Sequence, residues 1–337
     1  MKMSSITQEQ FLEAAALVRS WRRPLLVAHQ KPDGDAIGSL LALQRMLVGT
    51  GSNPKAVIFD ELPHRYKGLL SFGPLALWGS SATEDDLNAA DGVVILDTCT
   101  YNQLEPIAPW LRSSRKPLLV VDHHATRDAI GGLHLIDETA AATCLILFEW
   151  GRRLDWTFDP SCASALFVGI AMDTGWFRHS NCDARALAAA SELARLGARP
   201  NALFQMLYEK ERHGRLKLLA AALDTLELRA DGRLAIMRLP KNVFPRCAAT
   251  PADTEDIVNE PLRIESVVVS VLFVEQEDGV VRINLRSKEP PTPSDPEIDV
   301  AKVALRLGGG GHRRAAGARI PGALDEVYQH VICQLGV

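Results

Sequence analysis

The sequence predicts an α/β protein of two domains: a parallel sheet with helices on both faces, followed by a smaller α+β domain. Short, almost wholly apolar runs alternate with helical patterns in the first half, as in parallel strands that are buried on both faces. The second half instead contains strand–turn–strand patterns, and its two turns are Asp-Gly pairs. A chain of 337 residues is also long enough for two hydrophobic cores.

The boundaries follow the change in pattern along the chain. We place the first domain at residues 1–190, a helical connection at 191–224 and the second domain at 225–337. In the first domain, apolar runs predict buried strands at 24–29, 55–59, 91–97 and 117–124. Helical periodicity predicts helices at 7–21, 36–51, 162–175 and 183–198. Thr7 and Gln10 have the spacing of a capping box at the start of the first helix.

The second domain combines paired strands with two helices. Strand–turn–strand units are expected at 225–239 and 266–287, and helices at 300–307 and 323–335. The segment GGGGHRRAAGA lies between these helices. The Pro-rich segment 288–299 predicts a surface loop, whose role the sequence leaves open.

Composition and charge exclude several classes of protein. A net charge of −4 gives no global basic field, so we expect no long nucleic-acid duplex as partner, although a small phosphorylated ligand is compatible with it. No run approaches ~20 apolar residues, so we expect no membrane span. Six scattered cysteines and an N-terminal segment without an apolar core favour a cytoplasmic protein with reduced thiols. The assembly state stays open, and a homodimer is one option.

Acidic and imidazole side chains stand where three of the predicted strands end. Those at the strand ends are His29, Asp97, Asp122, His123 and His124. Asp33 and Asp35 follow in the loop after the first strand, and Asp173 ends an apolar helix. Because the carboxyl ends of parallel strands meet at one edge of a sheet, these residues are expected to converge there.

A cluster of four aspartates and two histidines fits a pair of divalent cations. Closely spaced carboxylates repel one another, and two dications would cancel their charge. Such a pair can lower the pKa of a bridging water, so that hydroxide forms at neutral pH, and can bind a phosphoryl group during in-line attack. Mixed His and Asp ligands favour Mn²⁺, two per active site, over Mg²⁺, with Mg²⁺ and Co²⁺ as substitutes.

Each residue also has a simpler interpretation. Asp33 and Asp35 beside glycine suit a turn, Asp97 suits a helix cap, and Asp173 suits a helix end. His123 and His124 could be ordinary hydrogen-bonded histidines. The glycine run could form a flexible loop, and Arg286 could be a solvated strand residue. The convergence of several such residues on one sheet edge favours the metal site.

The motifs HQKPDGDAIGS, LDT, VDHH and DTGWF resemble, in this order, those of the DHH phosphoesterase superfamily. NLRS and GGGGHRRAAG resemble the signature of its DHH-associated C-terminal domain. In layout and length the chain is most similar to the group of bifunctional oligoribonucleases and phosphoadenosine-phosphate (PAP) phosphatases. The resemblance implies an active site in the cleft between an N-terminal catalytic domain and a C-terminal substrate-binding domain.

The resemblance also implies roles for individual residues. One metal would be held by His29, Asp33 and Asp97. The other would be held by Asp35, Asp97, His123 and Asp173, so that Asp97 is the bridge. His124 would act with Asp97 in catalysis by contacting the scissile phosphate and assisting the leaving group, while Asp122 would orient a histidine. The residues expected to bind the substrate's other phosphate and sugar are Arg286, Ser287, Gly310, Gly311 and His312.

The implied function is metal-dependent hydrolysis of very short oligoribonucleotides and of nucleoside 3′,5′-bisphosphates, through attack of a metal-bridging hydroxide, to release nucleoside monophosphates. Three alternatives stay open: a phosphodiesterase for cyclic or linear dinucleotides such as cyclic di-AMP or pApA, a pyrophosphatase or exopolyphosphatase, and a non-catalytic nucleotide sensor. The residues do not decide among these substrates, nor do they fix the chain-length limit, the polarity of attack or the physiological metal.

Overall fold

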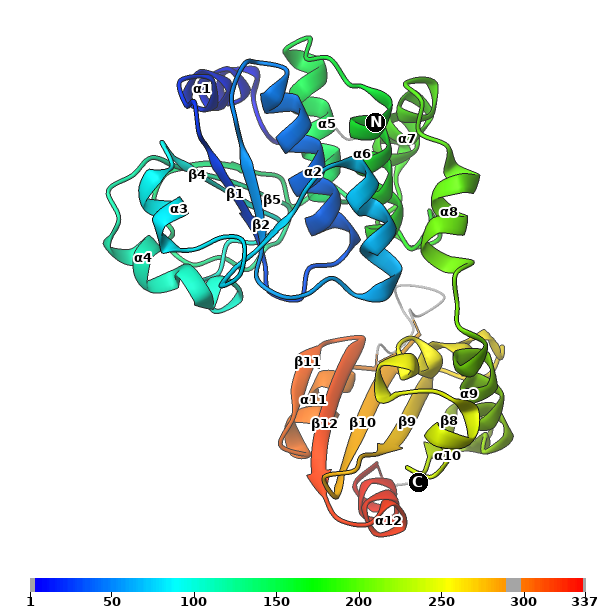
Figure 1. The fold of residues 1–337 in the computed structure, drawn as a ribbon. Coiled ribbons are helices and arrows are strands. Elements are labelled where there is room, and N and C mark those ends of the chain that lie inside the picture. The colour runs from blue at the N-terminus through cyan, green and yellow to red at the C-terminus, as the bar shows by residue number, and fades with distance from the viewer. Residues whose placement is uncertain (1–3, 289–297, 336–337) are drawn as a thin grey trace. The chain divides into compact units, whose positions relative to one another are not determined.

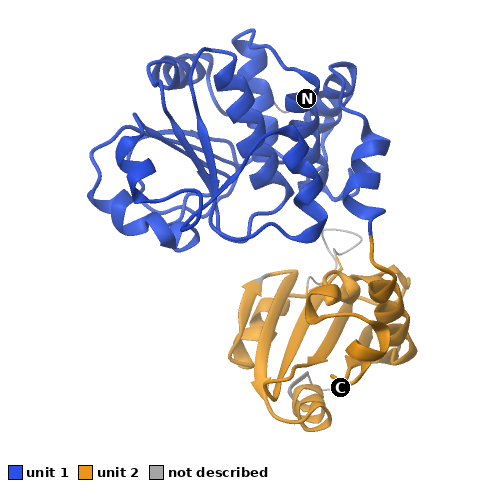
Figure 2. Ribbon diagram, viewed as in Figure 1, with its two compact units in different colours: residues 1–210 blue, residues 211–337 orange. Residues whose placement is uncertain are grey.

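The chain forms two compact units, residues 1–210 and 211–337 (Figure 2). The computed structural model describes residues 4–288 and 298–335. Most of the expected Pro-rich loop, 289–297, therefore lies outside the described residues. The helices of the expected connection divide between the units: α7 (Ala184–Arg195) and α8 (Pro200–Tyr208) belong to the first, and α9 (His213–Asp224) belongs to the second.

A six-stranded parallel sheet forms the centre of the first unit (Figure 1). Its order is β3-β2-β1-β4-β5-β6, with β1 Leu25–Ala28, β2 Lys55–Ile58, β3 Ala76–Leu77, β4 Val93–Leu96, β5 Leu118–Asp122 and β6 Leu133–Ile136. The four predicted strands are its four central strands, which confirms them. The edge strands were not predicted, because β3 has only two residues and β6 is mostly half-buried.

Helices cover both faces of this sheet, as predicted. Successive strand residues point to opposite faces, so Leu26 and Val94 belong to one core while Leu25 and Val93 belong to another. The helices on the first core are α1 Gln8–Arg19, α2 Gly34–Val48, α5 Thr143–Arg153, α6 Pro160–Asp173, α7 and α8. The second core is closed by α3 Glu84–Ala89, α4 Ala108–Ser113 and the 3₁₀ helix η2 Tyr101–Ile107. A further 3₁₀ helix, η1, spans His64–Phe72.

The capping box at the start of α1 is also confirmed. The Gln10 N–H donates to the Thr7 hydroxyl at 3.2 Å, and the Thr7 N–H donates to the Gln10 side chain at 2.8 Å. No helix within residues 4–288 and 298–335 combines the length and hydropathy that a bilayer crossing requires.

Helices α2 and α6 pack unusually closely, because glycines lie at their contact. A Cβ on Gly34 would lie 2.3 Å from Cγ of Met172, and one on Gly38 would lie 2.5 Å from the Ala165 carbonyl oxygen. A Cβ on Gly169 would lie 2.5 Å from a carboxylate oxygen of Asp35. These contacts leave no room for a Cβ at any of the three positions, so the close approach of the two helices depends on the glycines.

The second unit contains a mixed six-stranded sheet and is an α+β domain, as predicted. Its order is β11-β12-β10-β9-β8-β7, and only β8 and β9 pair in parallel. The strands are β7 Glu227–Arg229, β8 Leu234–Leu239, β9 Val269–Glu275, β10 Val280–Ser287, β11 Gly310–His312 and β12 Ala315–Pro321. One face packs on α11 Val300–Arg306 and α12 Leu324–Leu335; on the other, β8 and β9 pack on α9, α10 Val243–Cys247 and the 3₁₀ helix η4 Ile257–Arg263. A short 3₁₀ helix, η3, spans Pro251–Thr254.

Candidate metal centre

The loop after β1 places three of the predicted ligands. His29 directly follows the strand, and Asp33 is the N-cap of α2. One Asp33 oxygen accepts the N–H groups of Asp35 at 3.0 Å and Ala36 at 3.1 Å. The same oxygen lies 3.8 Å from Nε2 of His29. Asp33 therefore both caps α2 and lies beside His29.

Asp97 follows β4 in a left-handed conformation, with φ of 61°. Its N–H donates to the Val121 carbonyl at 3.0 Å, and its side chain is buried. The Thr143 hydroxyl donates to Oδ1 of Asp97 at 2.9 Å, and Nε2 of His29 lies 3.5 Å from Oδ2. Asp97 does not cap η2, whose N-cap is Thr100.

Asp122 fixes the turn that ends β5. One of its oxygens accepts the backbone N–H of His123 at 2.8 Å and that of His124 at 3.1 Å, and it lies 2.8 Å from Nδ1 of the His124 ring. Because a carboxylate accepts, Nδ1 of His124 carries the proton. The His124 side chain is 50% exposed, so its Nε2 edge is available to a substrate.

Asp35 and Asp173 come from the closely packed helices α2 and α6. The carboxylate of Asp35 is fully buried and accepts the N–H groups of Thr143 at 2.6 Å and Cys144 at 3.0 Å. These two groups begin α5, where the helix dipole favours negative charge. Asp173 lies 3.1 Å from Nε2 of His123.

All six predicted metal ligands come together in this unit. Three groups of side chains have ligand atoms within 4.8 Å of one another: His29, Asp33 and Asp97; Asp35, His123 and Asp173; and Asp97, His123 and His124. Asp97 and His123 each belong to two groups, so the groups form one continuous cluster. One group contains the residues of the first expected ligand set. The second expected set is divided, because Asp35, His123 and Asp173 form a group without Asp97, which instead groups with His123 and His124. The role of these residues as ligands is a proposal developed below.

Ring orientations show that the cluster fits a cation. Nδ1 of His29 lies 2.8 Å from the Gln30 carbonyl, and Nδ1 of His123 lies 3.3 Å from the Ala140 carbonyl. A carbonyl only accepts, so each Nδ1 carries a proton and each Nε2 is directed at carboxylates. Nε2 of His123 is buried, and although Asp173 lies 3.1 Å away, no described residue is aligned with this nitrogen for a hydrogen bond. A divalent cation would satisfy both the nitrogen lone pairs and the carboxylates.

The pKa shifts within the cluster also indicate a site for positive charge. Burial and the neighbouring Asp35 raise the pKa of Asp97, and burial with Asp35 raises the pKa of Asp173 to about 7. Burial alone would lower the pKa of the two histidines, but the carboxylates around them raise it to about 11 for His29 and about 10 for His123. Without a cation, bound protons therefore neutralise the cluster.

We expect metal binding to release protons and to strengthen as pH rises. His29 and His123 bind protons well above their ordinary pKa of 6.5, and a metal must displace these protons from Nε2. Apparent affinity should therefore rise about tenfold per pH unit for each proton displaced, between about pH 6 and about pH 8. Calorimetric titration of Mn²⁺ in buffers of different ionisation enthalpy counts the protons. A pH-independent affinity without proton release would contradict the assignment.

Sequence reasoning missed the contribution of α5. Thr143 and Cys144 hold Asp35 through their N–H groups, and the Thr143 hydroxyl holds Asp97. The available signal was a threonine directly before an apolar helical run. The backbone after Asp173 was also not predicted: Gly175, Trp176 and Phe177 all have positive φ, between 55° and 64°.

The five predicted substrate-binding residues lie in the second unit. Arg286 and Ser287 end β10, while Gly310, Gly311 and His312 form β11. Register places Arg286 opposite Ala315 of β12, and Ala315 opposite His312. Burial lowers the pKa of the Arg286 guanidinium, although the charge of Asp256 acts in the opposite direction. The Ser287 hydroxyl donates to the Ile298 carbonyl at 2.8 Å and is thus engaged within the unit.

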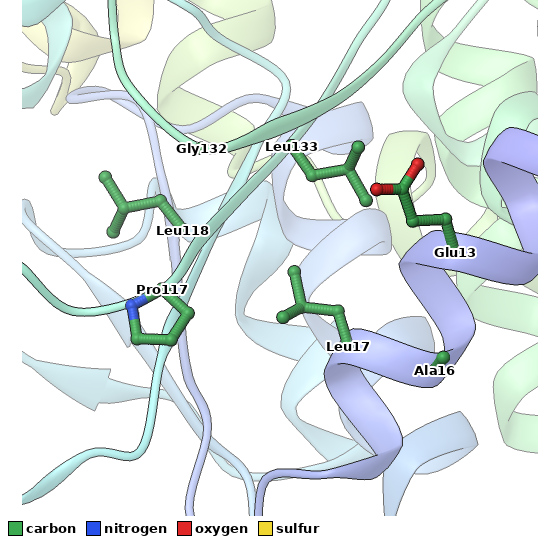
Figure 3. A pocket seen from close by; sticks show the side chains of 7 residues that line it. All are labelled: Glu13, Ala16, Leu17, Pro117, Leu118, Gly132 and Leu133. Atoms are coloured by element: carbon green, nitrogen blue, oxygen red, sulfur yellow. The ribbon is translucent and has the colours of Figure 1, made fainter.

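A separate cavity of about 440 Å³ lies at the end of the first sheet where β5 and β6 begin, away from the carboxyl ends of the strands (Figure 3). Its walls are Leu17 and neighbouring residues of α1 and the beginnings of β5 and β6, including Leu118 and Leu133. Glu13 is the only charged residue that lines it. The cavity therefore offers no ligand set comparable with the cluster at the carboxyl ends of the strands.

Comparison with known proteins agrees with this geometry. Residues 24–170 match the N-terminal domain of the DHH family, and residues 237–335 match the DHHA1 domain. The bifunctional oligoribonuclease and PAP phosphatase NrnA of Thermus thermophilus is 30% identical over 96% of this chain and 93% of its own. The chain belongs to the DHH family.

Other DHH-family relatives extend the comparison. The protein of the same name from Bacillus subtilis is 27% identical over 88% of both chains. A probable manganese-dependent inorganic pyrophosphatase of Bacillus cereus is 25% identical over 74% of this chain and 77% of its own. An exopolyphosphatase-related protein from Bacteroides fragilis has the same fold, with a TM-score of 0.88, 20% identity, and coverage of 99% of this chain and 98% of that one.

Proposed function

We propose that this DHH-family protein hydrolyses phosphoester bonds in very short oligoribonucleotides and in nucleoside 3′,5′-bisphosphates, releasing nucleoside monophosphates. The observation that carries the proposal is the cluster in which Asp97 and His123 join the groups of potential ligands. The relatives named oligoribonuclease and PAP phosphatase, which match almost the whole chain, support this substrate class.

The cluster would hold two divalent cations. His29, Asp33 and Asp97 would bind one, and Asp35, Asp97, His123 and Asp173 would bind the other. Mixed imidazole and carboxylate ligands favour Mn²⁺, and a relative named manganese-dependent supports that choice. When bound, such a pair lowers the pKa of a water and neutralises charge on a phosphoryl group.

His124 would contact the scissile phosphate and give a proton to the leaving oxygen. Its Nδ1 is directed at Asp122, which fixes the ring and leaves Nε2 on the exposed side. Asp122 thus acts as a positioning residue through His124.

The second unit would bind the part of the substrate that does not react. Arg286 can bind a phosphate through two parallel N–H donors. Gly310 has open space where a Cβ would stand, so a phosphate or sugar can approach its backbone closely. Ser287, Gly311 and His312 would complete this contact with the substrate's other phosphate and sugar.

Substrate competition tests the proposal directly. With Mn²⁺, we expect rapid hydrolysis of a ribodinucleotide and of phosphoadenosine phosphate, but little hydrolysis of pyrophosphate. A preference for pyrophosphate would favour the alternative that the Bacillus cereus relative suggests. Faster cleavage of cyclic di-AMP would instead indicate a cyclic-dinucleotide phosphodiesterase. Tight nucleotide binding without turnover would identify a sensor and refute the proposal.

A further inference from the structure

One face of β10 carries a row of polar side chains. Residues of this strand alternate, so that Val281, Ile283 and Leu285 enter the core against α11 and α12. Arg282 and Asn284 therefore lie on the opposite face, as does Arg286. In the antiparallel neighbour β12, Arg319 stands opposite Arg282, and Gly317 stands opposite Asn284.

A cavity of about 390 Å³ lies beside this row. The residues that line it are Arg282, Ile283, Asn284, Gly308, Gly309, Gly317, Ala318 and Arg319. Gly309 packs directly on β12, since a Cβ there would lie 2.1 Å from the Gly317 carbonyl oxygen. Gly308, by contrast, has open space where a Cβ would stand. The volume of the cavity is that of a site for an organic ligand rather than for a bare ion.

Two residues that line the cavity carry side-chain nitrogens without acceptors. Nε of Arg282 and Nδ2 of Asn284 are both buried beneath the cavity wall and have no hydrogen-bond partner among the described residues. A terminal nitrogen of Arg282 donates to the Thr254 hydroxyl. Buried donors without acceptors cost free energy, and rotation of either side chain toward a ligand rich in acceptor oxygens would remove that cost.

The charges around the cavity also favour an anion. Burial and the nearby Arg319 lower the pKa of Arg282, so the two guanidinium groups repel each other across the strand pair. Asp278 pairs with Arg319 at 3.2 Å. Among the described residues, it is the one acid that forms an ion pair with either of the two arginines. A phosphate placed between the two arginines would compensate their remaining charge.

We infer that this cavity binds a nucleotide of the RNA chain through its backbone phosphate, at a position separate from the phosphate contact proposed for Arg286. The inference rests on the proposed function. Arg282 and Arg286 are four residues apart, about 13 Å along a strand. Their guanidinium groups donate to different partners, the Thr254 hydroxyl and the Leu285 carbonyl, so each is placed for a phosphate of its own. Substrates long enough to reach both positions would gain affinity, whereas a dinucleotide or a mononucleotide bisphosphate would not.

The test compares substrate lengths in the full chain with Mn²⁺. Arg319→Gln changes a side chain that is 57% exposed, and Arg282→Gln removes the buried charge. Arg306→Gln, on the exposed side of α11, is the matched control. For both cavity variants we expect kcat/KM for a tetranucleotide to fall about tenfold, with values for a dinucleotide and phosphoadenosine phosphate changed less than about twofold.

A binding measurement separates this inference from the proposed function. Fluorescence anisotropy with a phosphorothioate tetranucleotide should show the same weakening and a shallower salt dependence in the variants. Equal losses for the dinucleotide or unchanged tetranucleotide binding would overturn the inference. Failure of the wild type to hydrolyse any dinucleotide would count against the proposed function instead.

Discussion

Replacing Asp97 with asparagine is expected to lower kcat for a ribodinucleotide by about 10³-fold or more. Asp97 joins two of the ligand groups, and asparagine keeps the shape while removing the charge that the cations need. Losing several kcal/mol of transition-state stabilisation corresponds to a rate loss of this size. Single-turnover kinetics with saturating Mn²⁺ measure it.

Asparagine is the informative replacement at this position. Asp97 has a φ of 61°, which asparagine tolerates better than most residues, so the backbone is not strained. An asparagine Oδ1 can still accept the Thr143 hydroxyl. Because burial and Asp35 raise the pKa of Asp97, the neutral replacement should make the metal-free protein at least as stable as the wild type. Near-wild-type turnover in a correctly folded variant would refute the role of Asp97.

Removal of divalent cations is expected to abolish hydrolysis and to lower the melting temperature of the first unit. A ligand at a hundred times its dissociation constant stabilises the folded state by about 2.7 kcal/mol. For a domain of this size, that corresponds to a shift of about 5–10 °C. Differential scanning calorimetry of the EDTA-treated and Mn²⁺-reloaded protein measures the shift.

The Asp97→Asn variant supplies the control for the metal experiment. Its melting temperature should respond much less to Mn²⁺ than that of the wild type, because one shared ligand is missing. The Arg306→Gln variant should respond like the wild type, since Arg306 lies on α11 in the second unit. An equal response of all three proteins would show that Mn²⁺ stabilises the chain at some other place.

Much of the first unit could be predicted because parallel strands that are buried on both faces consist of continuous runs of apolar residues. Those runs give β1, β2, β4 and β5, and the polar residues that follow them converge because the strands are parallel. β6 was missed because its residues are half-buried and give no continuous apolar run. The anchoring of Asp35 by α5 was missed because backbone N–H groups leave no mark in the sequence.

The cavity in the second unit could not have been predicted from sequence either. Arg282 and Arg319 lie on strands that are separated in the chain by α11 and β11, and they become neighbours only through the register of β10 and β12. Nor does composition reveal that Nδ2 of Asn284 lacks a hydrogen-bond partner among the described residues, because this depends on which side of the strand is covered. Long-range pairing of this kind depends on the whole sheet rather than on local pattern.

The glycines between α2 and α6 have a consequence for the choice of metal. Asp35 and Asp173 are carried by two helices whose close approach depends on these glycines, so the spacing of their Cα atoms cannot change unless a helix moves. The Asp35 carboxylate is also held by the N–H groups of Thr143 and Cys144, so it has little freedom to adjust to a cation of different radius. Altered metal preference should therefore arise through the loop residues His29 and Asp33 more readily than through either helix.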